Sequence, residues 1–101
     1  MPADSVFNKV HRLIKKGDIV AIRSLLDDGL NPNQTNRFGW TLLMLAALQG
    51  RTDIADLLIA KGADPSKLNK FGDSADSLAL VKGYRRTSTY LRKASKPNSE
   101  K

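Results

Sequence analysis

The spacing of apolar side chains predicts a chain built from short helices. Apolar residues recur every three or four positions, which places them on one face of a helix. The first helix is expected to follow a cap at Asp4 or Ser5 and to run through Lys16, and a second is expected to start at Asp18. The predicted apolar faces of these two helices are Val6, Val10, Leu13 and Ile14, and then Ile19, Ile22, Leu25 and Leu26.

The middle of the chain predicts a third helix that is buried on all sides. Thr41 is its expected N-cap, and residues 42–49 form its body. This segment is apolar almost all round, so we expect it between neighbouring helices. A fourth helix is predicted to open at Thr52 or Asp53. Its inward residues are expected to be Ile54, Leu57, Leu58 and Ile59.

Two further helices and a tail complete the pattern. Ser74 is the expected cap of a fifth helix, which carries Leu78, Ala79 and Val81. A sixth helix is predicted at about 85–94, with Tyr90 and Leu91 as its main apolar anchors. The polar residues around Pro97 predict a flexible tail at 96–101.

The glycines reveal an internal repeat of 33 residues. The chain has seven glycines, and a 33-residue spacing groups them as 17/50/83, 29/62 and 39/72, with none left over. The same spacing relates Leu25, Leu58 and Leu91, and it relates Phe38 to Phe71. Five glycines follow predicted helices and two suit the tip of a tight turn, where a left-handed backbone costs glycine little.

A 33-residue unit of one turn and two helices resembles the ankyrin repeat. The matching positions are Asn36, where the family usually has Asp, and Gly39, Thr41, Leu43, Ala46, Ala47, Gly50, Ile54, Leu57, Leu58, Gly62, Ala63 and Asp64. The resemblance implies an all-α solenoid of stacked helix–turn–helix units with finger turns and about six helices. It also implies a single domain at 1–95, with an N-terminal cap at about 5–35, a full repeat at 36–68 and a C-terminal cap at 69–95.

Two departures from the family pattern change the expected packing. The family motif Thr-Pro-Leu-His reads Thr41-Leu42-Leu43-Met44 in this chain. Met44 therefore replaces a histidine whose hydrogen bonds normally tie neighbouring turns, and apolar packing must compensate. Asp76 stands where the second copy has Leu43, and because an unpaired buried carboxylate is costly, we expect Asp76 to be exposed.

Composition narrows the class of protein further. The chain has 101 residues, a formal net charge of +7 and no cysteine, which excludes disulfides and thiol catalysis. No apolar run reaches the length of a membrane span, so we expect a soluble cytoplasmic protein without membrane contact. Residues 69–101 carry eight Lys and Arg against three acids, and this excess favours acidic partners.

The resemblance implies a protein-binding scaffold without catalytic activity or cofactor. In the family, the finger tips and the first helix of each unit form a concave binding face. Carried over by position, the candidate contacts are Arg37, Phe38, Trp40, Leu48, Gln49, Leu68, Lys70, Phe71 and Lys82. The implied partner is a protein or peptide with an apolar anchor and acidic flanks.

The aromatic candidates have competing interpretations. Phe38 and Phe71 repeat at 33 residues, so they either contact a partner or pack finger against finger. Trp40 has no aromatic counterpart, since Asp73 stands at the equivalent position, and this favours a partner contact at an exposed finger.

Other functions have weaker support in the sequence. His11 is the only histidine, and without cysteine or a second histidine it predicts no metal site. Ser88 follows basic residues as in a kinase site, but the repeat register turns it inward. The main alternative is electrostatic binding of nucleic acid or another anionic surface by the basic C-terminal third. A homodimer through the apolar concave face is a second alternative, although a monomer is favoured.

Overall fold

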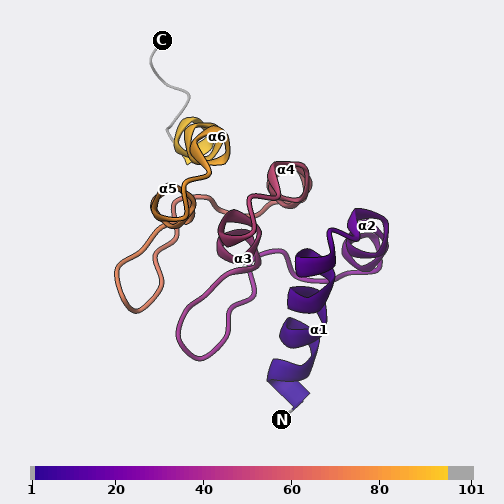
Figure 1. The fold of residues 1–101 in the computed structure, drawn as a ribbon. Helices are drawn as coiled ribbons and strands as arrows, with labels where there is room; N and C mark the ends of the chain where they lie inside the picture. Colours follow the sequence, from indigo (N-terminus) through magenta and orange to yellow (C-terminus); the bar gives the residue numbers. More distant parts are fainter. Residues whose placement is uncertain (1, 96–101) are drawn as a thin grey trace.

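The computed structural model describes the backbone of residues 2–95 and the side chains of residues 5–95. In this range six helices form two rows (Figure 1). The inner row holds α1 (Pro2–Lys16), α3 (Leu42–Leu48) and α5 (Ala75–Val81), and the outer row holds α2 (Ile19–Asp27), α4 (Thr52–Ala60) and α6 (Arg85–Ser95). Each inner helix and the outer helix that follows it form one repeat. The all-α solenoid predicted from the sequence is confirmed. The predicted tail at 96–101 lies outside the described residues.

The first helix is longer than predicted and buries a different aromatic face. It begins at Pro2, so Asp4 and Ser5 lie within its first turn and the predicted start of the helix was wrong. The prediction that Val6 faces inward was wrong, because Val6 is 46% exposed and Phe7 is only 3% exposed. Phe7, Val10 and Ile14 are spaced by three and four residues and share one face of the helix, and all three lie in the core.

Short polar side chains start the helices as predicted at three positions. Asp18 Oδ1 accepts from the Ala21 N–H, and Thr41 and Ser74 cap α3 and α5. In α3 the cap closes through Met44, whose sulfur accepts from the Thr41 N–H at 3.4 Å. Sulfur is a weak acceptor, but here it gives the Thr41 N–H a hydrogen-bond partner where the family motif has a histidine. The fourth helix differs, since Arg51 occupies its N-cap without a capping side-chain bond.

The core follows the 33-residue register. Val10 and Leu43 occupy equivalent inner-helix positions, as do Ile14 and Ala47, and each of these side chains is at most 1% exposed. The outer helices add Leu58 and Leu91, both fully buried. Ser88 is 2% exposed, which confirms that it faces inward.

Asp76 breaks this core pattern in the third repeat. Its side chain is half-buried, so the prediction that it is exposed was wrong. The Ser74 hydroxyl donates to Asp76 Oδ1 at 2.6 Å. This bond replaces part of the hydrogen bonding to water that the carboxylate loses on burial.

Two loops project from the same side of the stack (Figure 1). We call residues 28–41 the first finger and residues 61–74 the second finger. Their tips are built alike, because Asn36 Oδ1 accepts from the Phe38 and Trp40 N–H groups and Asn69 Oδ1 accepts from those of Phe71 and Asp73. The asparagine amide oxygen thus supplies the acceptor at the position where the family usually has Asp.

The fingers are joined to each other by backbone contacts. The Lys70 N–H donates to the Phe38 carbonyl at 2.9 Å. At the base of the fingers, Asn33 Nδ2 donates to the Gly62 carbonyl and Asn33 Oδ1 accepts from the Asp64 N–H, both at 2.8 Å. These bonds tie the two fingers together.

Each repeat also covers the glycine that ends the previous inner helix. Arg51 lies over Gly17 and donates to the carbonyls of Ile14 and Lys15, at 3.3 and 2.8 Å. A cation at a helix C-terminus interacts favourably with the helix dipole. The ring of Tyr84 lies over Gly50 in the equivalent place. A Cβ at Gly50 would come within 2.7 Å of that ring, so the repeats approach closely only because glycine is present.

No helix between residues 2 and 95 is long and apolar enough to cross a lipid bilayer.

Candidate functional site

A groove separates the first finger from the N-terminal half of α1. It has a volume of about 230 Å³ and receives side chains from α1, the first finger and α3. Its lining residues are Phe7, Asn8, His11, Asn36, Trp40, Leu45 and Leu48. The walls are mainly apolar and the amide and imidazole groups are polar, a combination typical of sites that hold an apolar anchor and orient it.

His11 is the one titratable group in this groove. Burial lowers the pKa of His11 below its ordinary value, and the positive charge of Lys15 lowers it further. The imidazole is therefore neutral at neutral pH, and it offers one donor and one acceptor.

Trp40 lies at the boundary between the core and this groove. The sequence predicted an exposed aromatic, but the indole is half-buried and packs against the core. Its backbone is held by Asn36, which accepts from the Trp40 N–H and donates its own N–H to the Trp40 carbonyl. Trp40 therefore has a structural role in the first finger as well as a surface in the groove.

The two finger phenylalanines pack against each other and remain partly exposed. The ring centroids of Phe38 and Phe71 are 6.3 Å apart with a tilt of 31°. Phe38 is still 48% exposed and Phe71 is 66% exposed. The Arg37 guanidinium lies 5.8 Å from the centroid of the Phe38 ring, within the range of a cation–π contact. The two phenylalanines thus pack finger against finger and still leave ring surface exposed that a partner could contact.

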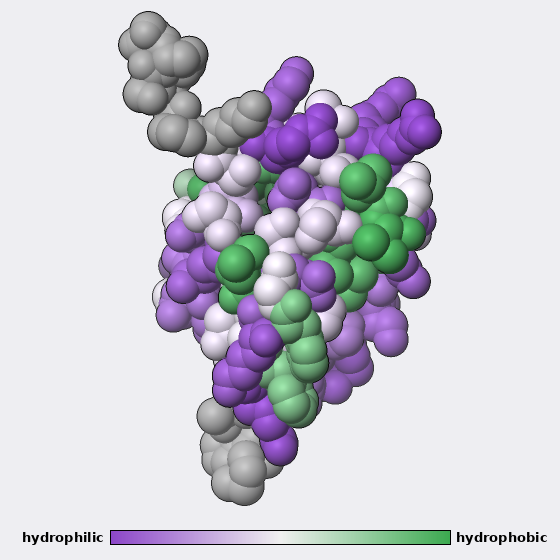
Figure 2. Space-filling model, turned by 90° about the vertical axis from the view of Figure 1, so that its left-hand side faces the viewer, coloured by the Kyte–Doolittle hydropathy of each residue, from purple (hydrophilic) through white to green (hydrophobic). Residues whose placement is uncertain are grey.

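The remaining predicted contact residues lie at several places on the stack. Leu48 joins Trp40 in the groove, and Gln49 is half-buried at the end of α3. Leu68, Lys70 and Lys82 are exposed. Figure 2 looks onto the side of the second finger and α5, where apolar residues interrupt a mostly hydrophilic surface.

Sequence reasoning missed several residues that line the groove. These are Phe7, Asn8, His11, Asn36 and Leu45. Three of them belong to α1, whose first turns the apolar pattern assigned to the wrong face. The length of α1 carries the missing signal, since only a helix longer than α3 and α5 can extend beside a finger.

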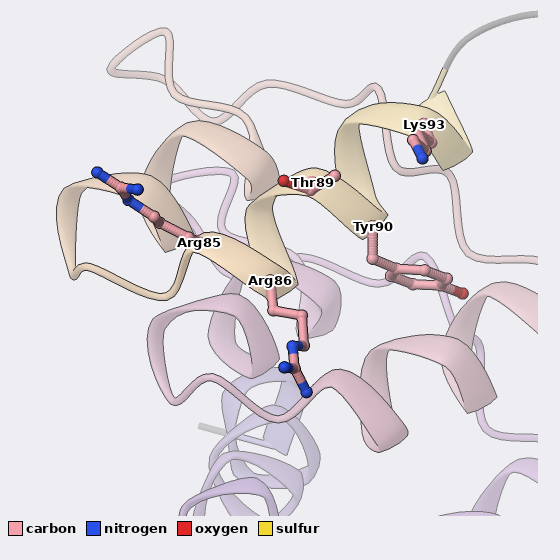
Figure 3. A pocket seen from close by; sticks show the side chains of 5 residues that line it. All are labelled: Arg85, Arg86, Thr89, Tyr90 and Lys93. Atoms are coloured by element: carbon pink, nitrogen blue, oxygen red, sulfur yellow. The ribbon is translucent and has the colours of Figure 1, made fainter.

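A second hollow, of about 530 Å³, lies on α6 and is strongly basic. It is lined by Arg85, Arg86, Thr89, Tyr90 and Lys93 (Figure 3). The Tyr90 hydroxyl donates to Asp56 Oδ1 of α4 at 2.6 Å. Burial raises the pKa of Tyr90 to about 12, and the hydrogen bond to Asp56 and its negative charge act in the same direction.

We expect Asp56→Asn to lower the pKa of Tyr90 from about 12 towards 10, because it removes the carboxylate that opposes phenolate formation. The shift will be partial, since burial is the largest cause. Ultraviolet absorbance titration measures it in a Tyr84→Phe background, which leaves one tyrosine. With a folded pKa above the unfolded value of about 10, Tyr90 stabilises the fold below pH ~10 and loses this effect as the pH rises towards 12. An unchanged pKa in Asp56→Asn would contradict the role of the carboxylate.

Comparison with known proteins now defines the class. A family model of ankyrin repeats in three copies matches residues 10–101. The chain therefore belongs to the ankyrin repeat family, as its motifs indicated. Ankyrin repeats are generally protein–protein interaction modules, and their fold is generally not catalytic. Residues 5–95 contain no group of three or more metal-ligating side chains that could hold a metal ion.

Individual proteins agree with this assignment. Human ankyrin repeat family A protein 2 is 37% identical over 75 residues, which cover 74% of this chain and 24% of that protein. The human ASB11 ankyrin repeat domain has a TM-score of 0.78 at 22% identity, covering 84% of this chain and 38% of that chain. A chain in the Bdellovibrio bacteriovorus complex of the predatory endopeptidase Bd0816 with the immunity protein Bd3460 also has a TM-score of 0.78. It is 25% identical, and the match covers 87% of this chain and 46% of that chain. This chain thus spans less than half of each of these proteins.

Proposed function

We propose that this chain is a protein-binding module that holds a partner protein or peptide against its fingers and inner helices. The observation that carries the proposal is the groove beside the first finger, where Trp40 and Leu48 meet Phe7 of α1. An apolar side chain of the partner would enter this groove. Burial of a large apolar side chain contributes about 1.5–3 kcal/mol, enough to make it a main anchor.

Exposed cations on the fingers and at the end of α5 define the rest of the partner. Arg37, Lys70 and Lys82 are exposed. Complementary charge speeds association and selects partners, so acidic residues should flank the apolar anchor. The partly exposed Phe38 and Phe71 add apolar area at the finger tips, next to Arg37.

The structural neighbours support the general mode of action. One of them belongs to an assembly of an endopeptidase with an immunity protein, so a chain of this shape occurs in a complex of two proteins. We apply to this chain only the binding of another protein, because the identity is 25%.

Site-specific crosslinking tests the proposed face. A benzophenone amino acid replaces Phe38 at the finger tip or, as the control, Val20, which is 74% exposed on α2. After irradiation in the source cell, we expect one protein to crosslink from position 38 and not from position 20. The exposed pair Lys70→Glu/Lys82→Glu should weaken its capture, whereas Arg23→Glu/Arg92→Glu, with the same charge change on the outer helices, should not. Crosslinking only from position 20, or equal loss in both pairs, would refute this binding face.

A further inference from the structure

The outer helices show which side of each repeat faces the next one. In the first repeat, Asp27 accepts from Lys61 Nζ of the second repeat at 2.8 Å. In the second repeat, Thr52 Oγ1 lies 2.6 Å from Thr87 Oγ1 of the third. Asp56 accepts from Tyr90 in the same junction. These positions are the forward side of the outer helices.

The 33-residue register carries these positions onto α6. Thr52 and Asp56 correspond to Arg85 and Thr89, and Asp27 corresponds to Lys93. All three border the basic hollow, and Figure 3 shows them on α6. They lie where a fourth repeat would pack if the stack continued.

The inner helix α5 has an open side in the same place. Ile14 and Ala47 are fully buried by the next repeat, but the equivalent Leu80 is 55% exposed. Gly17 and Gly50 are covered by Arg51 and Tyr84, whereas a Cβ at Gly83 would meet no atom within 4 Å. We call Leu80, Gly83, Arg85, Thr89 and Lys93 the end face. It has the apolar centre of a repeat junction and a strongly basic outer part.

We propose that the end face docks an acidic amphipathic helix of a partner protein, which packs against α5 and α6 as one repeat packs against the next. Residues 83–95 contain four Lys and Arg and no Asp or Glu, so the complementary surface must be acidic. Leu80 requires an apolar residue opposite it, next to those acids. The helix would lie across α5 and α6, away from the groove at Trp40.

Two other occupants fit the end face less well. A second copy brings another formal charge of +7 and exposes Lys9, Arg12 and Lys16 on its own first helix, so like charges approach. A nucleic acid complements the cations, but its phosphates offer nothing apolar to cover Leu80, which stands beside Val81 at 83% exposure.

Peptide binding tests this proposal. The probe is a fluorescent synthetic helix of Glu, Leu and Ala, with leucines every three or four positions, and the control probe has Lys in place of Glu. We expect the acidic probe alone to bind, and amide NMR shifts to cluster at residues 80–93. Arg85→Glu/Lys93→Glu should weaken binding about tenfold or more, because paired charges are reversed. Leu80→Ala should weaken it as well.

Matched controls separate the end face from general charge. Lys9→Glu/Arg12→Glu makes the same change in net charge on α1 and should alter binding less than about twofold, as expected for distant exposed charges. Fluorescence of Trp40, the only tryptophan, should stay unchanged. Equal loss in both charge pairs, no binding of the acidic probe, or a Trp40 signal would overturn the proposal. Light scattering that shows dimers unable to bind the probe would also overturn it. So would displacement of the probe by oligo-dT, if Leu80→Ala then leaves binding of the probe unchanged.

Discussion

Leu58→Ala is expected to lower the free energy of unfolding by about 2–5 kcal/mol, the usual range for a fully buried leucine. Leu58 is 0% exposed in α4, the outer helix of the middle repeat. Its removal leaves a cavity that the helices on both sides can fill only in part. A domain of this size has a total stability of about 5–15 kcal/mol, so much of the population would unfold on mild warming.

The same substitution at Leu80 provides the control. Leu80 is a helix residue that is 55% exposed, so Leu80→Ala should change stability by no more than about 0.5 kcal/mol, the range of ordinary surface substitutions. Urea unfolding followed by circular dichroism measures both variants. Equal losses would mean that the core of the middle repeat does not limit stability.

Gly39→Ala should destabilise the chain more than Gly72→Ala, although the two glycines have the same place in the repeat. Both adopt a left-handed backbone, with φ of +80° and +83°, which costs an alanine about 1–2 kcal/mol. Only Gly39 has a neighbour, because a Cβ there would lie 3.1 Å from Asn69 Cα and Lys70 N. The second finger must then move and strain the Lys70–Phe38 hydrogen bond.

The difference between the two variants isolates finger packing from backbone strain. Loss of a backbone hydrogen bond contributes about 0.5–1.5 kcal/mol, so Gly39→Ala should lose that much more than Gly72→Ala. Denaturant unfolding gives both values, and amide exchange at Lys70 should speed up only in Gly39→Ala. If both variants lose the same amount, the fingers move apart without cost.

The glycine spacing predicted most of the fold because backbone geometry depends on few residues. All seven glycines have positive φ, as their places at helix ends and turn tips required. The caps at Asp18, Thr41 and Ser74 are local for the same reason. Features that depend on neighbouring repeats were harder to predict. The apolar period could not decide between Val6 and Phe7, because both lie about one helical turn before Val10 and either spacing fits the buried face.

The candidate site was less predictable than the fold. The family register identified Trp40 and Leu48, which do share the groove. It could not identify Phe7 and His11, because they belong to α1 and the first repeat has no finger motif from which to carry positions over. Comparison of Asp76 with Leu43, its equivalent in the second repeat, also could not predict that Asp76 is half-buried. The comparison did not include the hydrogen bond that the Ser74 hydroxyl donates to Asp76.

The bonds between repeats also determine how the chain opens and closes. Those that join Asn33 to Gly62, Arg51 to Ile14 and Tyr90 to Asp56 span 29, 37 and 34 residues. Each junction therefore closes a loop of similar length, and its entropic cost is similar. The outer repeats each detach by breaking one junction, but the middle repeat is freed only when both junctions break. Thermal opening should therefore begin at the ends of the stack, and α3 and α4 should be the last helices to lose their order.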